Sequence, residues 1–441
     1  MLRPARQRAR DHADMHAQGN LGFFIKGGRI MAWQNDMEQW AQQIRQRNPF
    51  AARLVWDDRQ IDFGAFERPL VTLYVREASA LRYLLSPSLD GLGEAYVRGV
   101  FDVEGALDDI IDLAYSLSRG SDSRLKAIAS YFRHSRKADR QAIQYHYDVS
   151  DTFYTLWLDP LMVYSCAYFE TGEECLAEAQ VKKMDHILTK LKLTPGQTLL
   201  DIGCGWGGLV MRAAQRFGAH CLGITLSQNQ YETATARVRA AGLQDRIEIR
   251  LQDYRDTQGQ FDRIASVGMC EHVGLKGLPD YFSRIHSLLR DDGMALNHGI
   301  TLSSADSLEV PFGAGRFIEK YVFPGGELPH IGEVLRTMQQ GGLEALDVEN
   351  LRRHYAKTLS CWTMNFENQS VRIRQEVGEE KYRIWRVYLS GCAYAFRHDV
   401  VSIYQVLCHK AGRHADGLPW SRQYMYAHGD AEAATMPSPN G

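Results

Sequence analysis

The chain contains 441 residues, of which 45% are hydrophobic and 24% are charged, and its formal net charge is −2. This is the composition of a globular protein with room for two or three domains, and the near-zero charge gives no reason to expect nucleic acid as a partner. No uninterrupted apolar run approaches the roughly 18 residues that a membrane-spanning helix needs, so we expect no transmembrane segment.

The first 118 residues divide into a polar leader and a small domain. Residues 1–30 are arginine-rich and lack periodicity, and only the short run LGFFI follows the arginines. A signal peptide is therefore a poor fit, and we expect a mobile leader on an intracellular protein. Residues 31–118 combine strand-like alternation in PLVTLYVRE with helical spacing in GALDDIIDLAYSLSRG, which predicts a small α+β domain.

Residues 119–144 form a basic segment that links this domain to the rest of the chain. Between Arg119 and Arg140 there are seven lysines and arginines and only two aspartates, and Leu125, Ile128 and Phe132 lie among them at helical spacing. A solvated linker helix and a helix that lies on a membrane surface explain this pattern about equally well.

After Pro195 and Gly196, strand-like runs alternate with helical stretches. The runs read QTLLDIGCGWGG, HCLGITLS, RIEIRLQDY, FDRIASVGM and GMALNHGITL. This alternation predicts the α/β fold class, with a parallel sheet and helical connections. The chain from Tyr355 to about Lys410 is expected to be helical and rich in aromatic residues, and residues 411–441 form a polar tail that we expect to fray.

The eight cysteines are spread thinly along the chain, and no two form a C-x-x-C pair. That spacing argues against a structural zinc site and against a disulfide framework, so we expect no bound metal.

A glycine-rich turn, DIGCGWGG at 201–208, follows the first predicted strand. Glycines let the backbone approach a nucleotide closely, and the N-terminus of the next helix offers unpaired N–H groups. A dinucleotide-binding fold usually has an acidic ribose-binding residue about 20 positions later, whereas the second strand here ends in Gly223–Ser227 without a carboxylate. The D-x-G-x-G loop, with Thr225 and Gln230 after the second strand, resembles S-adenosylmethionine-dependent methyltransferases.

Seven longer segments follow one another in order between Tyr145 and Lys410. They read YHYDVSDTFYTLWLDPLMVYSCAYF (145–169), LLDIGCGWGGL (199–209), GITLSQNQ (223–230), VGMCEHVG (267–274), FIEKYVFPGGELP (317–329), HYAKTL (354–359) and YLSGCAYAFR (388–397). Together they resemble the cyclopropane-fatty-acyl-phospholipid synthases and the related mycolic acid cyclopropane synthases. The resemblance implies a Rossmann-like class I S-adenosylmethionine methyltransferase domain over 145–410, with a smaller N-terminal lipid-binding domain over 31–118.

The resemblance also implies a reaction. The sulfonium methyl of S-adenosylmethionine passes to a cis double bond of a phospholipid acyl chain, a base removes a proton from the new methyl group, and a cyclopropane ring closes. In the family a bound bicarbonate is that base, and the positions carried over to its site are Cys166, Glu271, His298, Ile300 and Tyr355. Gly299 departs from the family's pattern, in which a β-branched residue or threonine is expected there.

A larger set of positions is carried over to the S-adenosylmethionine site, with Tyr254 expected against the purine face. These positions are Tyr164, Ser165, Leu199, Leu200, Asp201, Ile202, Gly203, Cys204, Gly205, Trp206, Gly207, Thr225, Leu226, Ser227, Gln228, Asn229, Gln230, Tyr254 and Arg255.

Several alternatives stay open. The carbocation could resolve into a methylene- or methyl-branched chain, or the protein could bind lipid without catalysis, although Asp201 and Glu271 are both present. An older view of the family gives the Cys392 position a covalent role, but the carbocation route needs no nucleophile, so we predict that this thiol packs near the active site.

The resemblance further implies where the protein works and with what. We expect an unsaturated phospholipid at the membrane surface as the substrate. We also expect a cytoplasmic protein at the inner face of the membrane, and a homodimer.

Overall fold

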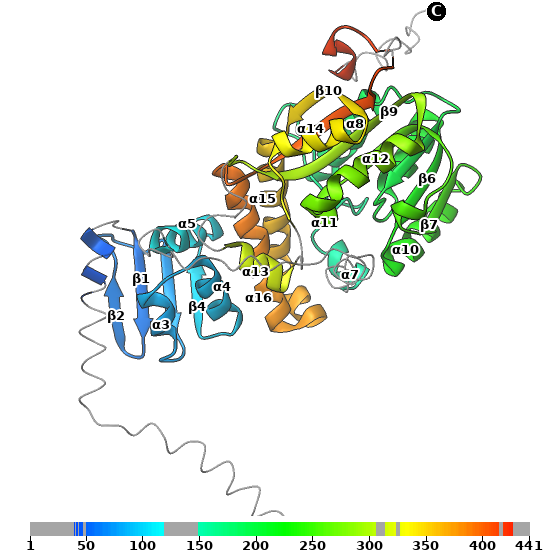
Figure 1. Cartoon of the computed structure of the whole chain (residues 1–441). Coiled ribbons are helices and arrows are strands. Elements are labelled where there is room, and N and C mark those ends of the chain that lie inside the picture. The colour runs from blue at the N-terminus through cyan, green and yellow to red at the C-terminus, as the bar shows by residue number, and fades with distance from the viewer. Residues whose placement is uncertain are drawn as a thin grey trace, which may run out of the picture. The chain divides into compact units, whose positions relative to one another are not determined.

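The computed structural model describes residues 50–118, 149–305, 314–322, 327–413 and 418–426, with helical residues also placed within 39–46. The chain forms two compact units, Met1–Pro87 with Gly99–Ser121 and Ser88–Arg98 with Asp122–Gly441. Figure 1 shows the elements of each unit. The expected leader (1–30) and basic segment (119–144) lie outside the described residues, as does the end of the tail (427–441).

The first unit is built on a four-stranded sheet in the order β2-β1-β3-β4. Its elements are β1 (Ala52–Trp56), β2 (Arg59–Asp62), β3 (Val71–Val75), α3 (Ala80–Leu85), β4 (Phe101–Gly105) and α5 (Leu107–Ser118). β1 pairs in parallel with β3, and the other neighbours pair antiparallel. The strand predicted in PLVTLYVRE is confirmed as β3, where the alternate residues Val71, Leu73 and Val75 are buried.

The second unit contains a seven-stranded sheet in the order β10-β11-β9-β8-β5-β6-β7. Its strands are β5 (Thr198–Ile202), β6 (His220–Thr225), β7 (Ile247–Leu251), β8 (Phe261–Val267), β9 (Leu289–Leu302), β10 (Leu343–Asn350) and β11 (Val401–Lys410). β5 to β9 pair in parallel, and β11 lies antiparallel between β9 and β10. The predicted α/β fold class is confirmed, and each of the five strand-like runs contributes one of the strands β5 to β9.

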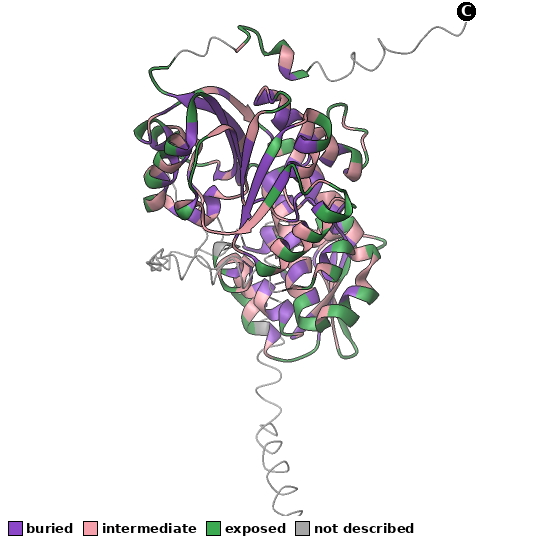
Figure 2. Cartoon of the chain, turned by 90° about the vertical axis from the view of Figure 1, so that its right-hand side faces the viewer, coloured by how far each residue is buried: buried purple, intermediate pink, exposed green. Residues whose placement is uncertain are grey.

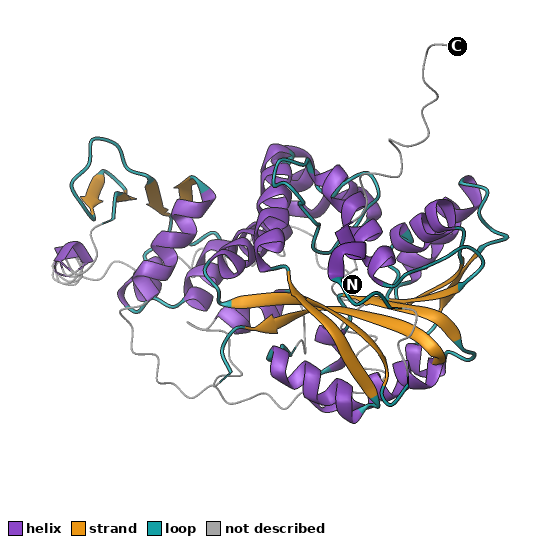
Figure 3. Cartoon of the chain, turned by 90° about the horizontal axis from the view of Figure 1, so that it is seen from above, coloured by secondary structure: helices purple, strands orange, loops and turns teal. Residues whose placement is uncertain are grey.

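Helices cover both faces of this sheet (Figure 3). The helices and 3-10 turns of the unit are α4 (Leu89–Val97), α7 (Asp151–Thr155), α8 (Leu176–Lys190), α9 (Gly208–Phe217), α10 (Gln228–Ala240), η1 (Tyr254–Asp256), α11 (Cys270–Val273), η2 (Leu275–Gly277), α12 (Leu278–Leu288), α13 (Ala314–Tyr321), α14 (Ile331–Gln340), α15 (Arg352–Asn368), α16 (Ser370–Arg397) and η4 (Arg422–Tyr426). Because both faces are covered, consecutive residues of the central strand β5, such as Leu199 and Leu200, are buried together, as Figure 2 shows for the strands of the sheet.

An aromatic core joins α7 to the long helices α15 and α16. The Trp157 ring lies 5.8 Å from the Trp362 ring and 5.7 Å from the Trp385 ring. The expectation of a helical segment from Tyr355 to about Lys410 is wrong for its last part, because Val401–Lys410 forms β11. This strand finds its hydrogen-bond partners on β9 and β10, which are distant in sequence, and a local pattern cannot reveal that pairing. No helix among the described residues is long and apolar enough to cross a membrane.

Candidate functional site

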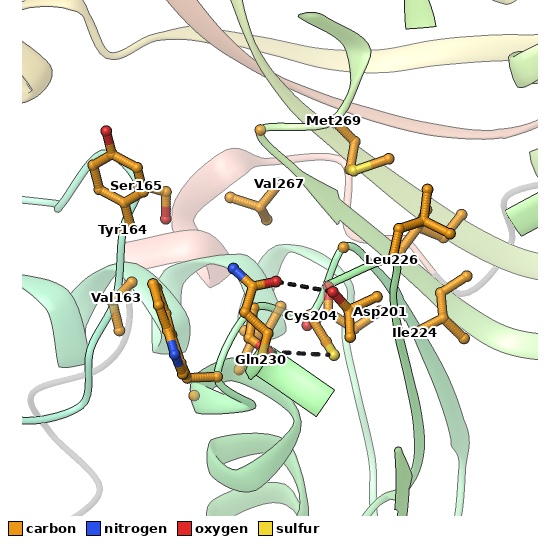
Figure 4. Close-up of a pocket in the computed structure, with 18 of the residues that line it drawn as sticks. Val163, Tyr164, Ser165, Asp201, Cys204, Ile224, Leu226, Gln230, Val267 and Met269 are labelled. Carbon is orange, nitrogen blue, oxygen red and sulfur yellow. Dashed lines mark hydrogen bonds between the residues drawn. The ribbon is translucent and has the colours of Figure 1, made fainter. Parts of the chain in front are cut away.

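A cavity of about 130 Å³ lies at the carboxyl ends of β5, β6 and β8. The chain continues from β5 to β6 on one side and has β8 on the other, and ligands of open α/β sheets bind where neighbouring loops diverge in this way. Among the positions predicted to bind the cofactor, those that line the cavity are Tyr164, Ser165, Asp201, Ile202, Gly203, Cys204, Gly205, Trp206, Thr225, Leu226, Gln230 and Tyr254. Figure 4 shows the labelled residues converging from the loop before α8 and from the ends of the strands.

The glycine-rich loop between β5 and α9 has a backbone that other residues adopt rarely. Gly203, Gly205 and Gly207 have φ values of +85°, +53° and +84°. A Cβ at Gly203 would lie 2.6 Å from the Met269 Cγ, so the close approach of this loop to the end of β8 requires glycine. The Gly203 N–H donates to the Ile224 carbonyl at 3.0 Å, which fastens the loop to β6.

Asp201 brings a buried carboxylate to the cavity. Its side chain is 2% exposed, and its Oδ1 has no hydrogen-bond partner among the described residues. Burial raises the pKa of Asp201 to about 7, and the nearby Lys183 acts in the opposite direction. A buried acceptor that lines a cavity without an internal partner suits a cationic group of a ligand.

The segment after β6 contributes polar groups to the cavity. Thr225 Oγ1 donates to Gln230 Oε1 at 2.8 Å, and both residues line the cavity with Leu226 between them in sequence. Ser227 begins α10 instead, because its hydroxyl accepts the backbone N–H of Gln230 at 3.4 Å. The turn therefore presents one side to the cavity and uses the other to start a helix.

Other positions predicted to bind the cofactor do not line the cavity, and most have structural contacts instead. The Arg255 guanidinium donates to the Asp253 carboxylate at 2.8 Å and 2.6 Å, and Asn229 donates to Asp151 at 2.8 Å. The full set that lies off the cavity is Leu199, Leu200, Gly207, Ser227, Gln228, Asn229 and Arg255.

Sequence reasoning missed several residues of the cavity wall. They are Met162, Val163, Lys183, Met184, Gly208, Leu209, Ile224, Gln252, Val267, Gly268, Met269 and His272. The charged member of this set that is fully buried is Lys183 on α8, whose Nζ donates to Ser165 Oγ at 2.8 Å. No spacing in the sequence distinguishes it from the adjacent Lys182, which is 38% exposed.

Glu271 lies one turn beyond β8, in α11. Its Oε1 accepts the backbone N–H of Ile300 at 2.7 Å, and the Cys270 thiol lies 3.5 Å from its Oε2. Burial raises the pKa of Glu271, and the Ile300 N–H opposes this rise. A Cβ at Gly299 would overlap the Cys270 Sγ, so the departure from the family's pattern at Gly299 makes room for the side chain that contacts Glu271.

Tyr355 on α15 brings further predicted residues into the same region. Burial raises the pKa of the Tyr355 hydroxyl well above the ordinary value. Electrostatic interactions with Cys166, Cys392 and Glu271 raise this pKa further. The Cys166 thiol donates to the carbonyl oxygen of the next residue, Ala167, at 3.3 Å. Burial raises the pKa of both thiols, to about 12 for Cys392, so both are protonated near neutral pH and neither has the character of a nucleophile.

His298 faces the other side of the sheet from Cys270. Its neighbour Gly299 points toward Cys270, and successive residues of a strand point to opposite faces. Burial lowers the pKa of His298 well below the ordinary value. The charge of Lys183 on α8 also lowers this pKa, whereas that of Glu349 on β10 raises it. Gln405 Nε2 lies 3.2 Å from the His298 Nδ1, and the His298 Nε2 is buried without a partner among the described residues.

Residues 134–406 match the family model described as mycolic acid cyclopropane synthetase. The chain belongs to this family. A probable fatty acid methyltransferase of Pseudomonas putida is 44% identical over 381 residues, which cover 84% of this chain and 95% of the relative. Cyclopropane mycolic acid synthase 1 of Mycobacterium tuberculosis is 38% identical over 276 residues, which cover 61% of this chain and 96% of the relative.

Solved structures of the mycolic acid cyclopropane synthetase family share the fold. The cyclopropane synthase MmaA2 from Mycobacterium tuberculosis aligns with a TM-score of 0.60 at 35% identity, covering 62% of this chain and 98% of that chain. The mycolic acid cyclopropane synthase CmaA1 in complex with SAH and CTAB aligns with a TM-score of 0.59 at 38% identity, with the same coverage. The protein is therefore an S-adenosylmethionine-dependent methyltransferase of this family. Residues 47–125 match a separate model of a domain of unknown function.

Proposed function

We propose that the protein transfers the methyl group of S-adenosylmethionine to a cis double bond of a phospholipid acyl chain and then closes a cyclopropane ring. The observation that carries this proposal is the position of Glu271 beside the cavity. Met269 and His272, which flank it in α11 and the preceding loop, both line the cavity, and the Glu271 carboxylate is buried. A carboxylate so near the methyl donor can take part in removing the proton of the new methyl group.

The cofactor would bind in the cavity through the predicted residues that line it. Asp201 offers an acceptor to the α-ammonium, Ser165 offers a hydroxyl, and Tyr254 offers a ring face to the adenine. In support, Asp201 Oδ1 has no partner among the described residues, and the Tyr254 ring is held edge-on against Tyr281 at 5.3 Å.

Aromatic rings beside the cavity would stabilise the carbocation. The rings of Tyr164 and Trp362 lie 5.3 Å apart, and the Tyr355 ring lies 5.9 Å from Trp362. A ring face attracts positive charge, and burial strengthens that attraction because water does not screen it. Tyr168, another aromatic candidate, is engaged elsewhere, in a stack with His186 at 4.2 Å.

Bicarbonate would supply the base that accepts the proton. We propose Glu271 and Tyr355 as the residues that hold it, with Cys166, His298 and Ile300 completing the set. Two features suit a small oxyanion: the Tyr355 pKa is raised, so its hydroxyl stays protonated and can donate, and the His298 Nε2 has no partner in the described structure. The Ile300 N–H is already bonded to Glu271, so it would act by orienting that carboxylate.

We further propose that the protein binds its phospholipid substrate at the cytoplasmic face of the membrane and that it is a homodimer. The domain over 31–118 would bind lipid, and the basic segment 119–144, which lies outside the described residues, would meet anionic headgroups. Support comes from the cations of that segment and from the fatty acids in the relatives' names.

A second outcome of the same methyl transfer has its own support. The Pseudomonas putida relative and a tuberculostearic acid methyltransferase of Mycobacterium tuberculosis, 35% identical over 371 residues, have names that speak of methylation and not of a ring. A 1,2-hydride shift would first move the positive charge to the methyl-bearing carbon. Loss of a methyl proton from that cation would give a methylene-branched chain, and a separate hydride donor would be needed to reduce it to a methyl-branched one.

The deciding experiment incubates the purified protein with S-adenosylmethionine and vesicles of a cis-unsaturated anionic phospholipid. Parallel samples contain the trans isomer and the free fatty acid. Mass spectrometry of the fatty-acid methyl esters before and after mild hydrogenation separates the outcomes, because a methylene group takes up hydrogen and a ring does not. A methylated product from the free acid alone, or none from the phospholipid, would reject the proposed substrate.

A further inference from the structure

Lys183 is a buried cation in the wall of the cavity. Its side chain is 3% exposed, and no carboxylate forms an ion pair with it within the part of the chain that the structure describes. Burial lowers the pKa of Lys183, and electrostatic interactions with the Cys166 thiol, Asp159 and Asp201 raise it. The charge of Lys183 in turn lowers the pKa of His298.

The other two lysines of α8 provide a contrast. Lys182 pairs with Glu170 and Glu174, each at 2.8 Å. Lys190 is as buried as Lys183, but it pairs with Glu349 at 2.5 Å and lies 3.6 Å from Asp347. Buried charges are normally paired, because the cost of removing them from water is large. A lysine that lines a cavity without such a partner therefore suits an anionic group of a ligand.

The hydrogen bond between Lys183 and Ser165 determines which donors an anionic group of a ligand would find in the cavity. An ammonium has only donors, so the Ser165 hydroxyl oxygen must accept the bond from Nζ. The hydroxyl proton of Ser165 is then left to donate, and Ser165 itself lines the cavity. Lys183 thus leaves the Ser165 hydroxyl free to donate a hydrogen bond and adds a positive charge next to it. A donor beside a positive charge favours the binding of a carboxylate.

Asp201 lines the same cavity, and its ionised carboxylate carries the opposite sign. A cavity wall that offers a cation, a hydroxyl donor and a carboxylate matches an α-amino acid in its zwitterionic form. S-adenosylmethionine ends in such a group.

We propose that Lys183 is the positioning residue for the α-carboxylate of S-adenosylmethionine, acting through the Ser165 hydroxyl and through its own charge. This inference rests on the proposed placement of the cofactor in the cavity. Its consequence is that the protein distinguishes cofactor-like ligands by their carboxylate and not only by their adenosine.

The test measures the affinity of two ligands by calorimetry, S-adenosylhomocysteine and its decarboxylated analogue, which keeps the ammonium and lacks only the carboxylate. Lys183→Met replaces the cation by an apolar chain of similar length. It should weaken the binding of S-adenosylhomocysteine on the order of ten- to a hundredfold and change the affinity for the analogue by less than about twofold. Lys182→Met, the matched control, should leave both affinities unchanged. An equal loss for both ligands, or no loss for either, would overturn the inference.

Two further measurements keep the test decisive if Lys183→Met does not fold. Ser165→Ala should also weaken S-adenosylhomocysteine selectively, and no such selectivity would count against the proposed route. The unmodified protein offers a second readout, because the pKa of Lys183 is lowered by burial to about 8 and a bound carboxylate would raise it. The affinity ratio of the two ligands should therefore fall as pH rises above about 8. A ratio independent of pH would contradict the role of Lys183.

The outcomes separate this inference from the proposed function. If the unmodified protein binds neither ligand, the placement of the cofactor fails. If it binds both, and Lys183→Met changes both equally, the placement stands and only the role of Lys183 is rejected.

Discussion

Replacing Glu271 by glutamine separates chemistry from cofactor binding. The substitution keeps the side chain's shape, and the glutamine carbonyl oxygen can still accept the Ile300 N–H that Glu271 Oε1 accepts at 2.7 Å. It removes the negative charge that would hold the bicarbonate hydroxyl and balance the carbocation. Because Glu271 does not itself line the cavity, we expect the affinity for S-adenosylhomocysteine to stay within about twofold.

The expected loss in kcat is about 10²- to 10⁴-fold, the range in which a positioned acid–base group contributes. The same carboxylate should shape the pH profile of the unmodified protein. Burial raises the pKa of Glu271, and the reaction needs its ionised form, so kcat should fall as pH decreases through a value above the ordinary glutamate range.

The assay follows methyl transfer from labelled S-adenosylmethionine into vesicle lipid, with calorimetry for cofactor affinity. Asp262→Asn is the matched control, because this carboxylate also accepts a backbone N–H, that of Thr198 at 2.8 Å, but at the start of β8, away from the cavity. The control should lower the melting temperature without a comparable loss of kcat. If Glu271→Gln weakened cofactor binding as much as turnover, the assignment of Glu271 to the anion site would be refuted.

Three further predictions concern other parts of the chain. Cys392→Ser should retain substantial activity, because burial holds the thiol protonated; complete loss with normal folding and cofactor binding would restore a chemical role for this thiol. Gly299→Thr should lower the free energy of unfolding by about 1–3 kcal/mol through overlap with Cys270, as measured by denaturant titration. Cys270→Ala should recover part of that loss, and strictly additive effects would show that the two side chains do not compete for space. Vesicle sedimentation should show weaker, less salt-sensitive binding to anionic lipid after neutralisation of three cations of the basic segment, and unchanged binding would make that segment a plain linker. These cations are Arg133, Arg136 and Lys137.

Local pattern was enough to identify the sheet and the glycine loop. The runs that became β5 and β6 are short and largely apolar, because strands covered on both faces need apolar side chains on both. Asp201, Gly203 and Gly205 could be recognised because the chemistry of the turn is local: the conformation of each glycine depends on its own lack of a side chain. β11 could not be recognised, because what makes Val401–Lys410 a strand is its pairing with β9 and β10.

The α8 helix shows most clearly what only the tertiary structure decided. Gln180, Lys183, His186 and Lys190 form a polar arc that, by pattern alone, indicates a face turned to solvent. All four are buried, because Glu349 and Ser165, distant in sequence, supply their partners. The sequence by itself determined the fold class, the family and the loop at the end of β5. Whether a charged residue of α8 meets water, a carboxylate or a cavity depended on which segments pack against it, and that is why Lys183 emerged only from the folded chain.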